Sequence, residues 1–156
     1  MININIILIK ARAKVDLKDK DGRTALIYAA DSNIESREAL KIIKLLLNAK
    51  ANINAKDKNG KTALIHAVEK RHYDDSQNMD MVKLLIDSKA DVNAKDNENR
   101  TALMHATSNN AADNVKLLIV AGADLNTEDI HGNTALDLAR YDKEIYKIIE
   151  AAMKKN

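Results

Sequence analysis

The chain has 156 residues, of which 46% are hydrophobic and 31% are charged, and this composition excludes a disordered or collagen-like chain. It contains no Cys, which excludes disulfides, a thiolate nucleophile and a Cys-ligated zinc site. The net charge of +2 is too small for a protein whose affinity comes from neutralising many phosphates, so nucleic acid is not an expected partner.

The first ten residues contain a short apolar run, whose positive charge follows the run instead of preceding it as in a signal peptide. The run is also shorter than the roughly 20 apolar residues that span a bilayer. No signal peptide or transmembrane segment is expected, and a cytoplasmic location is favoured.

The sequence Thr-Ala-Leu occurs four times, beginning at Thr24, Thr62, Thr101 and Thr134 with spacings of 38, 39 and 33 residues. Repeats of this length are typical of stacked supersecondary units. In each copy an Asp lies five residues before the Thr, and Gly or Asn lies two before it, which predicts a turn. The Thr is then predicted to cap a helix.

A second helix is predicted in each copy, because apolar residues recur at helical spacing over residues 40–47, 81–86, 115–119 and 145–149. The first two copies carry five and six extra residues between the paired helices, around residues 31–38 and 69–80. Such insertions are either tolerated polar loops or features that bind a partner.

The order of turn, helix and helix, with Thr-x-Leu-x-x-Ala followed by Leu-Leu and Ala-Asp-x-Asn, resembles the ankyrin repeat. The resemblance covers residues 19–152 as four helix pairs, and residues 6–18 are similar to the second half of a unit. It implies an all-α solenoid of stacked antiparallel helix pairs with β-hairpin-like turns. The expected single domain, 1–156, divides into a half repeat at 1–18 and repeats at 19–56, 57–95, 96–128 and 129–156.

Members of this family typically bind other proteins and lack catalysis, so the resemblance implies a non-catalytic protein-binding module. The alternative is a regulatory or immunity-type subunit that inhibits a cognate enzyme by occluding its site. No catalytic residue, cofactor or metal is expected.

The chain departs from the family pattern at two places in each unit. The usual Thr-Pro-Leu-His is Thr-Ala-Leu here, followed by Ile27, Ile65, Met104 or Asp137, so the Pro and the buried His of that pattern are missing. The Gly that normally ends the second helix remains at Gly122 and is replaced by Arg12, Lys50 and Lys89. A left-handed conformation at each replacement would cost on the order of 1 kcal/mol.

Three fragments imitate functional motifs without completing them. Gly60-Lys61-Thr62 resembles the end of a phosphate-binding loop but lacks its first Gly, and the segment from Asp19 to Gly22 lacks the first and last ligands of a calcium loop. His66 and His105 occupy one register in adjacent units, whose helices are expected roughly 8–10 Å apart, too far to share a zinc ion. We expect these two histidines to pack between helices or lie at the surface.

The resemblance implies that the turn tips and first helices form the concave contact face. The candidate contact residues are Lys18, Lys20, Arg23, Asp31, Ser32, Lys56, Lys58, Lys61, Glu69, Lys70, Lys95, Arg100, Ser108, Asn109, Ile130, His131 and Tyr141. Equivalent residues line up along a solenoid, and their positive bias over the first three units favours a protein partner with an acidic patch. The alternative is a solvated charged edge.

Other recurring polar residues are expected to be structural. The turn-entry Asp residues, together with Asn54, Asn93 and Asn126, are predicted to bond turn backbones.

The two ends of the stack are expected to differ in how polar their outer faces are. Terminal units need polar outer faces, and the last unit supplies Lys and Glu, whereas Ile4, Ile6, Ile7 and Leu8 are expected to remain partly uncovered. Either the natural chain is longer, or this edge meets another molecule, with self-association as one possibility. The residues predicted to solvate the C-terminal cap are Lys143, Glu144, Lys147, Lys154 and Lys155.

Overall fold

The computed structural model describes residues 14–32, 36–70 and 75–155, which form helices, turns and loops without a strand. The expectations for the N-terminal edge, including Arg12, therefore lie outside the described residues. The helices form four antiparallel pairs: α2 (Ala25–Asp31) with α3 (Ser36–Asn48), α4 (Ala63–Glu69) with α5 (Asp75–Asp87), α6 (Ala102–Ser108) with α7 (Ala112–Val120), and α8 (Ala135–Leu138) with α9 (Lys143–Met153).

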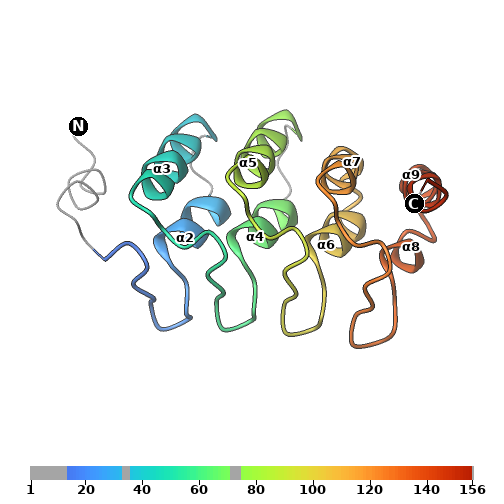
Figure 1. The fold of residues 1–156 in the computed structure, drawn as a ribbon, viewed down its shortest axis with the longest axis horizontal. Coiled ribbons are helices and arrows are strands. Elements are labelled where there is room, and N and C mark those ends of the chain that lie inside the picture. The colour runs from blue at the N-terminus through green and yellow to red at the C-terminus, as the bar shows by residue number, and fades with distance from the viewer. Residues whose placement is uncertain (1–13, 33–35, 71–74, 156) are drawn as a thin grey trace.

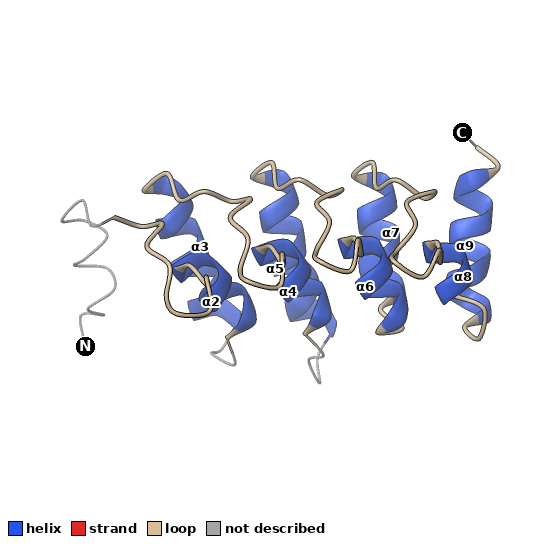
Figure 2. Ribbon diagram, turned by 90° about the horizontal axis from the view of Figure 1, so that it is seen from below, coloured by secondary structure: helices blue, strands red, loops and turns tan. Residues whose placement is uncertain are grey.

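The pairs stack side by side in two rows (Figure 1). The first helices, α2, α4, α6 and α8, form one row, and the second helices form the other. A turn projects from the first-helix row ahead of every pair, and the view from the turn side shows the same order along the stack (Figure 2). The predicted all-α stack of antiparallel helix pairs is confirmed.

Each first helix begins where the repeated Thr predicts it. The hydroxyl oxygens of Thr24, Thr62, Thr101 and Thr134 accept hydrogen bonds from the backbone N–H three residues on, at 3.3–3.5 Å. Such a cap satisfies one of the donors that a helix leaves free at its start.

The core consists of small aliphatic side chains. Leu26, Leu64 and Leu103, the Leu of three Thr-Ala-Leu segments, are at most 1% exposed and lie in one continuous cluster with second-helix residues such as Ile43 and Leu118. A sequence without Phe or Trp forms this core because Ala and aliphatic side chains let the helices approach closely.

Most of the inserted residues lengthen helices. Helices α3 and α5 each have 13 residues, whereas α7 has nine, so four of the extra residues in each long unit belong to the second helix. The prediction that the insertions are inter-helix loops is therefore wrong for most of their length, because they continue the α-helix at its N-terminal end.

The residues that follow two of the second helices adopt the left-handed conformation considered above. Lys50 and Lys89 have φ values of 66° and 70°, at the position where Gly122 has 89°. The two lysines therefore carry backbone strain that glycine avoids.

Backbone and side-chain hydrogen bonds join each unit to the next. At the turn tips, Lys58 N–H donates to the Asp21 carbonyl at 2.9 Å, and Asn97 N–H donates to the Asn59 carbonyl at 2.9 Å. At the opposite end of the units, the side-chain oxygens of Asn54 and Asn93 accept from the backbone N–H of the following unit at 2.9 and 2.8 Å. The predicted structural role of these two Asn residues is confirmed; both are exposed, as is the equivalent Asn126 of the last unit.

Candidate partner-binding surface

The turn tips and the first-helix row together form one surface, which we call the turn-and-first-helix face (Figure 1). The turn-entry residues Asp19, Asp57, Asp96 and Asp129 fix its shape, as predicted. One carboxylate oxygen of each accepts two backbone N–H groups, from the residues two and four positions on, at 2.8–2.9 Å.

Two of the candidate lysines stabilise the stack. The ammonium groups of Lys18 and Lys56 donate to the backbone carbonyls of Lys56 and Lys95, one unit on, at 2.8 and 2.7 Å. Both lysines are nevertheless exposed, as are Lys20, Lys58 and Lys95.

The bases that precede the capping Thr are neutralised in the first two units. Arg23 forms an ion pair with Asp31 at 2.5 Å, and Lys61 forms one with Glu69 at 2.6 Å. In both units the base lies at the start of the first helix and the acid at its last residue. The structure therefore pairs candidate contact residues with one another. These ion pairs reduce the excess positive charge of the turn-and-first-helix face.

His105 extends the second of these ion pairs into the next unit. Its Nδ1 lies 2.9 Å from a Glu69 oxygen in the preceding unit, and its Nε2 lies 2.8 Å from Asp96 Oδ2 in its own turn. His105 therefore bridges carboxylates of two neighbouring units. Lys61, Glu69, His105 and Asp96 form one continuous polar chain across two units.

His66 repeats this arrangement one unit earlier with looser geometry. Its Nε2 lies 2.9 Å from Asp57 Oδ2, while its Nδ1 lies 3.4 Å from Arg23 Nη2 and 4.0 Å from Asp31 Oδ2. Both histidines are buried between helices, as expected, yet each also lies between carboxylates of two neighbouring units, which the sequence reasoning missed. A signal for these contacts was present in the sequence. In each of the first three units, the residue nine positions after the turn Asp can form a hydrogen bond: Tyr28, His66 or His105.

The pKa of Glu69 reflects its place in the polar chain. Partial desolvation raises it, but the hydrogen bonds and charges of His105 and Lys61 outweigh desolvation and lower the pKa from 4.5 to about 2. A lowered carboxylate pKa stabilises the folded state above the unfolded value and loses that contribution as the pH falls toward the folded value.

Replacing Glu69 with Gln is therefore expected to flatten the acid dependence of stability. Between pH 6 and pH 3, the free energy of unfolding of the wild type should fall by about 1–2 kcal/mol more than that of Glu69→Gln, after allowance for solvent screening at a carboxylate that is partly exposed. Urea unfolding at the two pH values measures the difference. Glu38→Gln is the matched control, since that acid pairs with Lys41 at the surface, and an equal flattening there would contradict the assignment.

The third unit lacks the carboxylate at the end of its first helix. Arg100 occupies the position of Arg23 and Lys61, but the residue eight positions on is Ser108, whose hydroxyl is in close contact with Arg100 Nη2. In the fourth unit Leu138 replaces the histidine, and Asn133 instead donates to Asp129 at 3.3 and 3.4 Å.

The remaining candidates divide into structural and exposed residues. Asn109 Nδ2 donates to the Glu69 carbonyl at 3.1 Å, which ties α6 to α4, and Ser32 donates to the Ala29 carbonyl at 2.9 Å. Lys70 is half-buried at the end of α4, and desolvation lowers its pKa. In the last unit, Tyr141 is 91% exposed, Ile130 is 56% exposed and His131 is exposed.

Comparison with protein families agrees with this architecture. A family model for ankyrin repeats in three copies matches residues 3–77 and again residues 74–155, which together are nearly the whole chain. The chain belongs to the ankyrin repeat family. Ankyrin repeats are generally protein–protein interaction modules, and no curated protein matches this chain.

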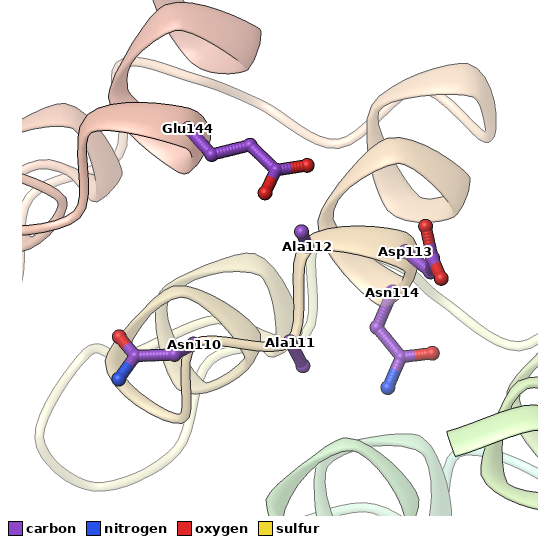
Figure 3. A pocket seen from close by; sticks show the side chains of 6 residues that line it. All are labelled: Asn110, Ala111, Ala112, Asp113, Asn114 and Glu144. Atoms are coloured by element: carbon purple, nitrogen blue, oxygen red, sulfur yellow. The ribbon is translucent and has the colours of Figure 1, made fainter.

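The clefts found among the described residues of this ankyrin array are small. One of about 210 Å³ lies where the α6–α7 connection faces the start of α9, and is lined by Asn110, Ala111, Ala112, Asp113, Asn114 and Glu144 (Figure 3). Small-molecule sites usually measure 300–1,000 Å³. Lys116 also lies 3.2 Å from Asp113 and 3.6 Å from Glu144, so the two acids of the cleft already have a counter-ion.

Metal clusters and membrane-spanning helices are both absent from the described residues. Within that part of the chain, no three His, Asp or Glu side chains gather closely enough to hold a metal ion. None of its helices has the length and apolar character that crossing a membrane requires.

Proposed function

We propose that this ankyrin array is a non-catalytic module that binds a partner protein on its turn-and-first-helix face. The observation that carries the proposal is the exposure of large apolar side chains where that face ends, Tyr141 beyond α8 and Ile130 at the last turn tip. Tyr and other large apolar side chains are frequent anchors of protein interfaces, because they bury much area with little loss of conformational freedom.

Exposed charge on the same face favours a partner with an acidic patch. Lys20, Lys58 and Lys95 extend the face toward its N-terminal units without an intramolecular carboxylate partner among the described residues. Exposed charges at the rim of an interface mainly steer the encounter between partners. Arg23 and Lys61 contribute less than the sequence indicates, because each is already paired.

Site-specific photocrosslinking tests which face binds. A photoreactive amino acid placed at Tyr141 or Ile130 is expected to crosslink one and the same protein in an extract of the source cells. The matched control is Val120 on the second-helix row, which is 86% exposed and apolar but lies on α7. Equal crosslinking of that protein from Val120 would contradict the proposal, because contact would then not be confined to the turn-and-first-helix face.

A further inference from the structure

The polar chains of the first units show what the third unit lacks. In units one and two, a base at the start of the first helix meets a carboxylate at its end, Asp31 or Glu69, and the histidine of the next unit approaches the same carboxylate. Arg100 keeps the base in unit three, but Ser108 and Leu138 replace the carboxylate and the histidine.

Arg100 is consequently under-satisfied within the described chain. It is half-buried, its Nε has no hydrogen-bond partner, and no carboxylate within the described residues forms an ion pair with it. Because Nε is buried, a carboxylate from another molecule would meet the Nη groups of this guanidinium, a planar donor suited to carboxylates.

The surface beside Arg100 is open to another molecule. Ser108 is exposed, and α6 and α8 pack side by side (Figure 1). In the repeat register, Tyr141 is the equivalent of Ser108 one unit on. Tyr141 is the most exposed of the large apolar residues described, and the Arg140 guanidinium lies 5.6 Å from its ring.

We propose that Arg100 binds an Asp or Glu side chain of the partner protein, which takes the place that Glu69 holds in the preceding unit, while an apolar neighbour of that acid packs on Tyr141. This inference rests on the proposed function and narrows its partner to a segment with one acidic and one apolar anchor. A polyanion fits less well, since Asp96 and Glu98 precede Arg100 in the same turn and the net charge is only +2.

The first experiment supplies the missing carboxylate from within the chain. Ser108→Glu should pair with Arg100 and raise the melting temperature by about 1–4 °C relative to Ser108→Gln, a range set by the strength of partly exposed ion pairs in a chain of this size. The gain should vanish when Arg100→Gln is added. Equal melting temperatures for the Glu and Gln variants would overturn the inference, because a carboxylate would then not fit beside Arg100.

The second experiment uses a random peptide library displayed on phage and selected on the folded wild-type protein. Selected peptides should share an acidic residue at one position, and Arg100→Gln and Ser108→Glu should each weaken them about tenfold or more. Ser108→Gln adds similar bulk without the charge, so it should weaken the peptides less than Ser108→Glu does. Selection on Arg100→Glu should replace the acidic residue with Lys or Arg.

The outcomes separate this inference from the proposed function. Peptides that weaken on Tyr141→Ala yet bind Arg100→Gln as tightly as the wild type would overturn the role of Arg100 and leave binding on this face intact. Peptides that are insensitive to both substitutions but weaken when α7 is altered at Val120 would overturn both proposals.

Discussion

Replacing His105 with Ala is expected to lower the free energy of unfolding by about 2–4 kcal/mol, because it removes the centre of the polar chain that joins the second and third units. Asp96, whose side chain is 3% exposed, would keep its backbone hydrogen bonds but lose the partner of Oδ2. Glu69 would keep Lys61 alone. Urea unfolding followed by circular dichroism measures the loss.

Substitutions of His66 and His131 are expected to cost less stability than His105→Ala. His66→Ala should cost less than His105→Ala, because its second carboxylate lies at 4.0 Å instead of 2.9 Å. His131→Ala is the control at an exposed turn position and should change stability by no more than about 0.5 kcal/mol. A loss at His105 as small as that at His131 would show that the polar chain does not couple the units.

A double-mutant cycle separates the stabilising effect of the polar chain from that of side-chain packing at His105. If His105 and Glu69 act through their contact, the cost of His105→Ala should be smaller in a Glu69→Gln background than in the wild type. Purely additive losses would indicate that the histidine contributes volume to the core and little through its charge.

The sequence predicts the repeating elements well because each depends on local chemistry. Thr24 and its equivalents cap helices through a bond to a residue three positions away, and the turn Asp residues bond backbone groups two and four positions away. Lys50 and Lys89 adopt the left-handed conformation because the helix ends there, whichever residue occupies the position. Such short-range relationships can be inferred from spacing alone.

The charge pattern of the binding face could not be inferred in the same way. Arg23 and Lys61 look like free bases in the sequence, but their acids stand eight residues on, across a helix of seven residues. The contact of His105 with Glu69 spans two units, so it depends on how the helix pairs stack. In two units a basic residue is followed eight positions later by an acidic residue. Aligning the repeats with one another would have shown this pattern.

Gly60→Ala is expected to be the most damaging substitution at a turn, with a loss of about 2–4 kcal/mol that combines backbone strain with a clash between neighbouring turns. Gly60 has a φ of 77°, and an added Cβ would lie 2.8 Å from the backbone nitrogen of Asn97 and 3.0 Å from the backbone carbon of Asp96. The clash falls beside the bond from Asn97 N–H to the Asn59 carbonyl that joins the two turns.

Gly132→Ala is a matched control, because Gly132 has nearly the same φ, 75°, but its Cβ would meet nothing within 4 Å. Its loss should be about 1–2 kcal/mol, the cost of the left-handed backbone alone. The difference between the two variants therefore measures the contact between turns, and faster hydrogen exchange at the Asn97 amide should accompany Gly60→Ala and not Gly132→Ala. Equal losses would mean that the turns move apart freely. If the losses differ as expected, the turns hold one another in register, and the exposed Lys20 and Lys58 are presented to a partner from a rigid edge.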